Sequence, residues 1–263
     1  MIKVVPGIKH KRRLVFFYLL CVWSTSFSQS RYVLNHGAII RGDSSTKQIA
    51  LIFSGDEYGE GLNFIQSTLK KEKVNASFFF TGRFYRNKQF IPGIKKLLRD
   101  GHFLGPHSDR HVLYCDWVKR DSLLITKNEF IDDLHKNYES MNDLQVNPDH
   151  TKYFLPPYEW YNDSISSWAH DLGVQLINFT SGTLSHTDYT TLKDRNYRDN
   201  QVIFKSIIDY ENKNTTGLNG FILLMHIGAG PDRKEKFFTR LPELIKLLKQ
   251  RGYHFSALDQ LLK

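Results

Sequence analysis

From residue 48 onward, short apolar runs alternate with segments whose apolar residues recur at helical spacing, and this alternation limits the folds open to the chain. The short runs are almost continuously apolar, as expected for strands buried on both faces of a parallel sheet. They comprise residues 49–53, 76–80, 103–104, 153–155, 174–177, 221–225 and 254–257. The helical stripes lie around residues 62–69, 94–98, 130–141, 165–172, 203–208 and 241–248.

About seven strand and helix units without an intervening linker predict one α/β domain with a closed or nearly closed barrel. An open, doubly wound parallel sheet is the alternative. The glycine fingerprint that binds dinucleotide phosphates is absent from the sequence, which argues against a nucleotide-binding version of that sheet. In either fold, functional residues are expected where the parallel strands end.

The N-terminal segment has the three parts of a secretory signal peptide. Basic residues 9–13 precede the apolar run 14–23, and the small residues Ser26 and Ser28 follow. We therefore predict cleavage near Ser28 and a secreted or periplasmic protein. The alternative is an uncleaved segment that anchors the chain to a membrane.

The predicted division of the chain is a signal peptide over 1–28, an N-terminal extension over 29–47 and a catalytic domain over 48–263. Removing the signal peptide lowers the formal charge from +9 to +4, because it carries five cations and no acids. No basic repeat interleaved with aromatic residues remains, so we predict no nucleic-acid partner. Nothing in the sequence identifies a protein partner.

Two histidines four residues apart, His107 and His111, directly follow the predicted strand 103–104. Imidazoles at this spacing within one helix-like turn project to the same side and can bind one metal ion with coordination positions left open. About 0.5 such pairs arise by chance in a chain with this many histidines, so the spacing alone does not identify a metal site, and the neighbouring residues have to be considered. The alternative is a solvated turn with two unrelated imidazoles.

Unusual polar residues also follow three other predicted strands. Ser54-Gly55-Asp56-Glu57 follows the first strand, Pro156-Pro157-Tyr158-Glu159 follows the strand at 153–155, and His226 follows the strand at 221–225. Because the carboxyl ends of parallel strands meet at one edge, these residues are expected to converge with the histidine pair.

Together these motifs resemble the polysaccharide deacetylases with a NodB-type domain, carbohydrate esterase family 4, from about residue 48 to residue 263. The metal motif of that family, His-Ser/Thr-x-x-His, is matched by His107-Ser108-Asp109-Arg110-His111, and its Leu-x-His motif is matched by Leu224-Met225-His226. Residues 73–82 and 241–258 are similar to its second strand and its closing helix, turn and strand. The resemblance implies a distorted (β/α) barrel of about seven strands.

The implied activity is removal of N- or O-acetyl groups from a carbohydrate. A divalent metal ion, with zinc favoured over other ions, acidifies a water molecule and polarises the acetyl carbonyl, and a carboxylate accepts the proton of the water. The resemblance assigns His226 as the acid that protonates the departing amine or alkoxide. The alternative for His226 is a polar residue that caps the strand end.

The first family motif, Thr-Phe-Asp-Asp-Gly, is altered here. Its two aspartates supply the base and a metal ligand, but direct alignment puts Ser54 and Gly55 at those positions. If the loop is one residue longer, Asp56 reaches the metal as the third ligand beside the histidine pair, and Glu57 becomes the candidate base. The alternative for Glu57 is an acidic residue that interacts with a helix dipole.

The third family motif, Arg-Pro-Pro-Tyr/Phe-Gly, is altered as well. Leu155 replaces the arginine that orients the catalytic aspartate, which is consistent with the loss of that aspartate. We predict that Pro157, Tyr158, Glu159 and Trp160 bind substrate, with the two aromatic rings stacked on sugars or simply packed together. Glu159 is a replacement base or a ligand of sugar hydroxyls. A further family motif expected near residues 178–183 is not matched, so no carboxylate partner for the catalytic histidine is identified.

The sequence thus predicts an exported, metal-dependent carbohydrate deacetylase. A carbohydrate-binding pseudoenzyme that keeps the metal but lacks the base is the first alternative, and a metalloamidase acting on a non-sugar amide is the second.

Overall fold

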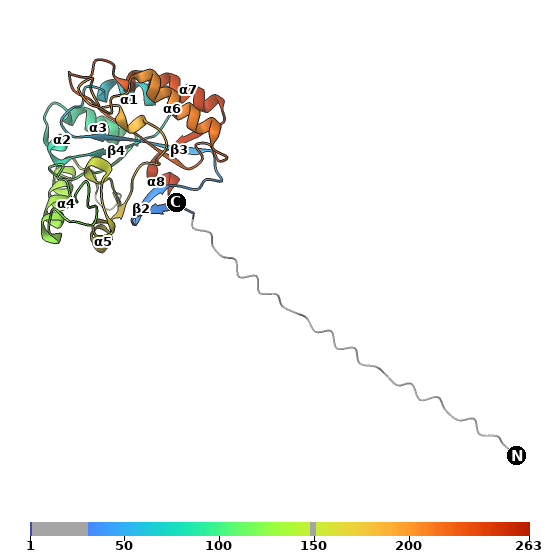
Figure 1. The fold of residues 1–263 in the computed structure, drawn as a ribbon, viewed down its shortest axis with the longest axis horizontal. Coiled ribbons are helices and arrows are strands. Elements are labelled where there is room, and N and C mark those ends of the chain that lie inside the picture. Colours follow the sequence, from blue (N-terminus) through green and yellow to red (C-terminus); the bar gives the residue numbers. More distant parts are fainter. Residues whose placement is uncertain (2–30, 148–150) are drawn as a thin grey trace.

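A computed structural model describes residue 1 and residues 31–147 and 151–263 (Figure 1). Apart from Met1, the predicted signal peptide lies outside these residues. Within the described residues, no helix is both long enough and apolar enough to cross a membrane.

The centre of the molecule is a parallel sheet built around β3 (Gln48–Gly55). Strand β8 (Phe221–His226) pairs with one side of β3. Strand β4 (Ser77–Phe80) pairs with the second half of the other side and is followed by β5 (Phe103–Pro106). Strand β9 (His254–Ser256) pairs with the first half of β3. Residues 49–53 are fully buried, as predicted for strands covered on both faces.

An antiparallel hairpin that the sequence patterns did not predict extends this sheet. It consists of β1 (Val33–Asn35) and β2 (Ala38–Arg41), and β2 pairs with β8. The two turn residues, His36 and Gly37, both have positive φ angles of 44° and 76°, as a tight type I′ hairpin requires. Part of the predicted extension, 29–47, therefore contributes to the same sheet as the predicted domain.

The sheet curls into a half-barrel, and a short parallel pair stands across its open side. This pair is formed by β6 (Tyr153–Phe154) and β7 (Gln175–Leu176). The backbone N–H of Leu155 donates to the carbonyl of Pro106 at the end of β5, and a bridge joins Ile39 of β2 to Ile177. The short pair is thus joined to each edge of the curled sheet by a single contact, and the result is a distorted barrel, as predicted.

Apolar side chains fill the inside of the curled sheet. The cluster takes residues from the parallel strands β3, β4, β5 and β8 and from the C-terminal helix α8 (Leu258–Leu261). The backbone N–H of Leu258 donates to the hydroxyl of Ser77, the first residue of β4. Helix α8 thus closes the barrel at the amino ends of the strands, and the carboxyl ends are left for the site.

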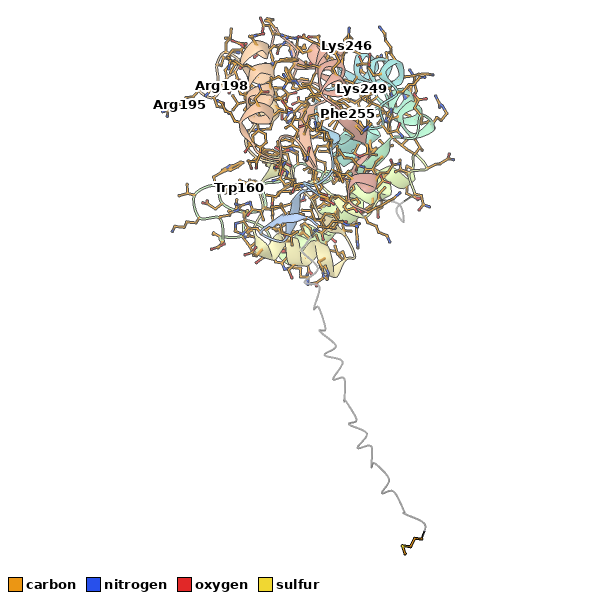
Figure 2. The ribbon with its side chains drawn as sticks, turned by 90° about the vertical axis from the view of Figure 1, so that its right-hand side faces the viewer. Trp160, Arg195, Arg198, Lys246, Lys249 and Phe255 are labelled. Carbon is orange, nitrogen blue, oxygen red and sulfur yellow. The ribbon has the colours of Figure 1, made fainter. Side chains whose placement is uncertain are left out.

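The remaining helices cover the outside of the sheet, and their side chains fill the space between the two layers (Figures 1 and 2). The helix α4 begins with a capping box, in which Thr126 and Glu129 satisfy each other's backbone N–H groups. The helices are α1 (Leu62–Glu72), α2 (Gly82–Arg86), α3 (Ile91–Arg99), α4 (Lys127–Asn142), α5 (Asp163–Asp171), α6 (Asn200–Lys213) and α7 (Leu241–Gln250). Short 3₁₀ turns occur at Pro157–Glu159, Ser185–Thr187 and Phe237–Arg240.

Candidate active site

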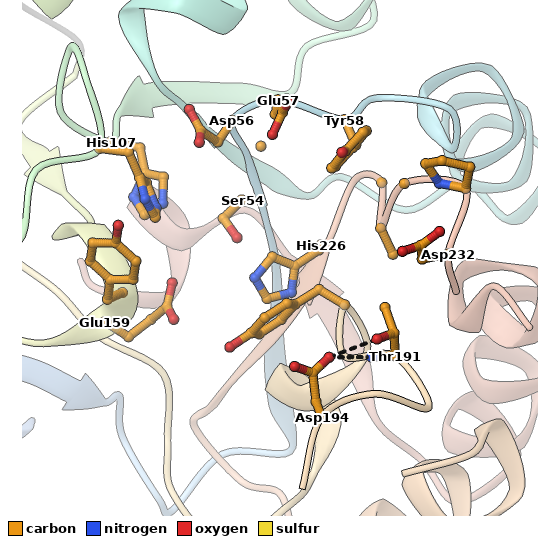
Figure 3. A pocket seen from close by; sticks show the side chains of 18 of the residues that line it. Ser54, Asp56, Glu57, Tyr58, His107, Glu159, Thr191, Asp194, His226 and Asp232 are labelled. Carbon is orange, nitrogen blue, oxygen red and sulfur yellow. Dashed lines mark hydrogen bonds between the residues drawn. The ribbon is translucent and has the colours of Figure 1, made fainter. Parts of the chain in front are cut away.

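A cavity of about 840 Å³ opens at the carboxyl ends of the parallel strands (Figure 3). Its size lies in the range of ligand pockets. Seven of the nine predicted site residues line it, namely Asp56, Glu57, His107, His111, Tyr158, Glu159 and His226. The loops after β3, β5, β6 and β8 therefore converge, as expected from the parallel sheet. The chemical roles of these residues stay predictions.

The other two predicted residues, Pro157 and Trp160, do not line the cavity. Pro157 is buried below the loop. The Trp160 ring packs beside Trp117 at a centroid distance of 5.5 Å, and its Nε1 donates to the carbonyl of Asp116. Trp117 is half-exposed and does line the cavity, in contact with Tyr158. The aromatic rim thus contains Trp117, which the sequence did not identify, with Trp160 as its support.

The two predicted metal-binding histidines lie on a tight loop after β5. The rings of His107 and His111 are 5.0 Å apart between centroids, at 64° to one another. Ser108 and His111 have positive φ angles of 73° and 58°, and the backbone N–H of His111 donates to the hydroxyl of Ser108. Because two of the four residues 108–111 have left-handed backbone, the loop turns back on itself, and both imidazole rings lie at the wall of the cavity.

Helix α4 holds this loop in place. Its Asn137 side chain accepts the backbone N–H of His107 at 2.7 Å. The buried carboxylate of Asp133 accepts the backbone N–H groups of Asp109 and Arg110, both at 3.3 Å, and the hydroxyl of Tyr114 at 2.9 Å. These bonds satisfy the backbone donors of a buried loop and fix its position.

Both imidazoles are suited to binding a metal ion. The Nδ1 of His107 donates to the carbonyl of Leu155 at 2.8 Å, which leaves its Nε2 with a free lone pair. Burial lowers the pKa of His107 to about 3, helped by the proximity of His111. Burial likewise lowers the pKa of His111 to about 4. Both rings are therefore neutral at ordinary pH, which is the form that binds metals.

The predicted third ligand, Asp56, is paired with an arginine. Arg83 donates from Nε to Oδ1 at 2.5 Å and from a terminal nitrogen to Oδ2. Burial would raise the pKa of Asp56, but the hydrogen bonds from Arg83 and the nearby positive charges outweigh it and lower the pKa. Among the described residues, no three His, Cys, Asp or Glu side chains are arranged to hold a metal ion. The donor types fit zinc, but Asp56 completes the set only by turning from Arg83.

The register of β3 decides how the altered first motif is read. Ser54 and Gly55 pair with Phe79 and Phe80 of β4 in regular sequence, and Ser54 also pairs with His226. No extra residue is therefore inserted before Gly55, and Asp56 is the first residue beyond the strand. Ser54 lines the cavity at the position of the missing carboxylate, and its buried hydroxyl has no hydrogen-bond partner in the described chain.

His226 forms an ion pair with a carboxylate that the sequence analysis did not find. Its Nδ1 lies 2.6 Å from Oδ1 of Asp188, and its backbone N–H donates to Oδ2 at 3.0 Å. Burial would lower the pKa of His226, but the charge and hydrogen bond of Asp188, together with the charge of Glu159, raise it above its ordinary value. A histidine held in this way is an effective proton donor.

Glu159 has a strongly perturbed carboxyl group. Burial is the main reason that its pKa rises to about 7, with the charge of His226 acting against the rise and that of Asp188 adding to it. By contrast, Glu57 lies exposed at the rim of the cavity. The site therefore brings together two neutral imidazoles, one histidine that favours its charged form and one carboxyl group that titrates near neutral pH.

A family model described as polysaccharide deacetylase matches residues 41–177, which is more than half of the chain. The chain belongs to the polysaccharide deacetylase family. The family predicted from the loop motifs is thereby confirmed.

Two sequence relatives of this chain carry names that refer to peptidoglycan. The chain is 28% identical over 196 residues to a peptidoglycan-N-acetylglucosamine deacetylase of Bacillus cereus, covering 74% of this chain and 78% of the relative. It is 24% identical over 227 residues to the peptidoglycan-N-acetylmuramic acid deacetylase PdaA of Bacillus subtilis, covering 86% and 76% respectively.

Solved structures confirm the predicted barrel fold. PdaA of Bacillus subtilis, a family 4 carbohydrate esterase, superposes with a TM-score of 0.66 at 23% identity over 86% of this chain and 85% of that one. A family 4 pseudoenzyme of Bacillus anthracis superposes with a TM-score of 0.67 at 23% identity over 88% and 70%. A mutant of that pseudoenzyme is described as having restored enzymatic activity. The same fold thus carries active and inactive sites.

Proposed function

We propose that this member of the polysaccharide deacetylase family is an exported, metal-dependent hydrolase that removes N- or O-acetyl groups from a carbohydrate. One observation carries the proposal: His107 and His111 face the same cavity as His226, which Asp188 holds from outside the cavity lining (Figure 3). A metal-binding group and a proton donor on either side of one cavity are what hydrolysis of an acetyl group requires.

His107, His111 and Asp56 would hold the divalent ion, with zinc favoured by the two imidazoles. When bound, the ion supplies a Lewis acid that polarises the acetyl carbonyl and acidifies water. Arg83 keeps Asp56 ionised in the meantime. The buried loop bonds to Asn137 and Asp133 keep both imidazoles in position without the ion.

His226 is the proton donor in this proposal. The Nδ1 of His226 bonds to Asp188, so its Nε2 is the nitrogen that can donate a proton into the cavity. The raised pKa favours the protonated ring, which can give its proton to the leaving amine or alkoxide. Asp188 stabilises the charged ring and fixes its orientation.

An acetylated amino-sugar polymer is the proposed substrate, supported by the names of the two peptidoglycan deacetylases among the relatives. The exposed rings of Trp117 and Tyr158 at the cavity mouth suit the apolar faces of sugar rings. The predicted signal peptide supports a place of action outside the cytoplasm, free or membrane-anchored.

A carbohydrate-binding pseudoenzyme is the second candidate, because Ser54 and Gly55 occupy the positions of the two motif carboxylates. The test is acetate release from acetylated oligosaccharides by protein that has been stripped of metal and reconstituted with zinc. Release that requires metal and disappears in His107→Ala supports the hydrolase. Binding of zinc and glycan without any acetate supports the pseudoenzyme.

A further inference from the structure

No carboxylate stands at position 54 of β3. Ser54 lies there beside His226, and a neutral hydroxyl is a poor base at ordinary pH. Hydrolysis at this site therefore depends on another carboxylate of the cavity.

Most carboxylates that line the cavity already have partners. Asp56 is held by Arg83, Asp232 forms an ion pair with Lys193 at 2.8 Å, and Asp194 accepts from the backbone and hydroxyl of Thr191. Glu57 and Glu159 remain. Glu57 is exposed at the rim, whereas Glu159 lies deeper, beside the charged pair of His226 and Asp188.

The backbone aims Glu159 into the cavity. Tyr158 and Glu159 are two successive residues with left-handed backbone, at φ angles of 57° and 52°, a conformation that is unfavourable for residues with a Cβ atom. The side chain of Asn178 donates to the carbonyl of Glu159 at 2.8 Å, and the N–H of Glu159 donates to the carbonyl of Pro156 at 3.1 Å. Strain maintained by such bonds is typical of functional loops.

The Glu159 carboxylate is free to accept a proton. Figure 3 shows it pointing into the space between the predicted metal-binding histidines and His226. None of the described residues donates a hydrogen bond to it. The ionisable groups that face it are His226, Asp188 and Tyr189. With its pKa raised to about 7 by burial, it is a stronger base than an ordinary glutamate and is still partly ionised at neutral pH.

We propose that Glu159 is the catalytic base of this site and replaces the carboxylate that Ser54 does not supply. This inference rests on the proposed function. The Glu159 carboxylate accepts a proton from the attacking water as the water oxygen bonds to the acetyl carbon and the carbonyl π pair moves to the carbonyl oxygen. The oxyanion pair of the intermediate then re-forms the carbonyl as the bond from the acetyl carbon to the sugar nitrogen or oxygen breaks, and the acetic acid released ionises to acetate in solvent. His226 protonates that atom, and the proton on Glu159 passes to solvent.

Two substitutions of Glu159 test the proposal with zinc-reconstituted protein and an acetylated oligosaccharide as substrate. Glu159→Gln keeps the shape, and Glu159→Gly suits the left-handed backbone. We expect both to lower kcat by about 100-fold or more with little change in KM. The rise of wild-type kcat/KM with pH through about 7 disappears in both variants. Formate, a small carboxylate, restores activity to Glu159→Gly but not to Glu159→Gln, which a merely structural role would not produce.

Glu139→Gln on the exposed face of α4 is the matched control and keeps wild-type activity. The proposal is overturned if the Glu159 variants keep the wild-type rate and pH profile, or if Glu57→Gln alone abolishes the reaction. Wild-type protein that releases no acetate with zinc overturns the proposed function itself. An active wild type with unaffected Glu159 variants overturns only the assignment of the base.

Discussion

The Nδ1 atom of His226 lies 2.6 Å from Oδ1 of Asp188, and the second carboxylate oxygen of Asp188 accepts the backbone N–H of the same histidine. The two bonds fix both the ring and the main chain of His226. Because Asp188 is almost completely buried, its charge acts on the imidazole with little screening by solvent. The pair therefore sets both the orientation and the protonation state of the proposed proton donor.

Replacing Asp188 by Asn should lower kcat by about 10- to 100-fold. The neutral amide no longer stabilises the charged ring, so the pKa of His226 falls and the alkaline limb of the pH profile moves to lower pH. The measurement is kcat against pH, with the histidine titrated in parallel by NMR. Asp163→Asn is the control, since it breaks another His–Asp pair, with His36, at the surface. An alkaline limb that stays in place would contradict the role of Asp188.

Replacing Arg83 by Met should tighten zinc binding by about tenfold, equivalent to about 1.4 kcal/mol. The reason is that the Asp56 carboxylate is released from its present partner and adds uncompensated negative charge beside the two imidazoles. Calorimetric titration with zinc measures the change. Arg240→Met removes an arginine from a pair with Glu243 on the surface and should leave binding unchanged. Weaker binding by Arg83→Met would mean that the arginine positions the ligand.

Replacing Asp133 by Ala should reduce the free energy of unfolding by about 3 kcal/mol, because two buried donors and one half-buried donor lose their acceptor. Asp133→Asn keeps one acceptor oxygen and should cost less. Urea unfolding monitored by circular dichroism gives both values. The neighbouring exposed Asp132→Ala is the control. If Asp133→Ala unfolds like the control, the histidine loop is held by other contacts.

Replacing Trp117 by Ala should raise KM for acetylated oligosaccharides several-fold and leave kcat nearly unchanged. The ring is 53% exposed at the cavity mouth, so its loss removes a stacking surface without opening the core. A small acetyl ester that does not reach the rim should be hydrolysed as by the wild type. Val118→Ala, at a residue 91% exposed, serves as the control. Equal loss on both substrates would assign the ring a structural role.

Replacing Glu159 by Gly should raise the free energy of unfolding at pH 8 by about 1 kcal/mol, since glycine adopts the left-handed backbone without strain. The raised carboxyl pKa adds a second effect. The folded wild type binds this proton more tightly than the unfolded chain does, so its stability falls as pH rises from about 4.5 to about 7. The variant should lack that decline. Urea unfolding at pH 5 and pH 8 measures it, and equal pH dependence in both proteins would contradict the prediction.

Periodicity predicted the long elements well because each buries one face over several residues. Strand β3 and helix α4 are examples. The hairpin of β1 and β2 was missed because strands of three and four residues give too few alternations to recognise. Its turn, His36-Gly37, was the available signal, although His-Gly is not among the residue pairs preferred in two-residue hairpin turns.

The sequence identified the site residues that follow a recognisable strand. It did not identify those that only a tertiary contact brings to the site. His107, His111 and His226 follow recognisable strands. Asp188 lies in an irregular segment 38 residues before its histidine, and no local pattern links the two. Trp117 also lies on a loop outside the repeating units. Only the strand register, which pairs Ser54 with His226, shows that Ser54 takes the position of a motif carboxylate.

The closure of the barrel by α8 has a practical consequence for attaching this protein to a surface or carrier. Arg31 and Tyr32 donate hydrogen bonds to the carbonyls of Lys263 and Leu262, so residues 31–32 lie next to residues 262–263, at the end of the barrel remote from the cavity. A carrier, bead or lipid surface joined through Arg31 or Lys263 would leave the cavity mouth facing outward, accessible to a long glycan strand.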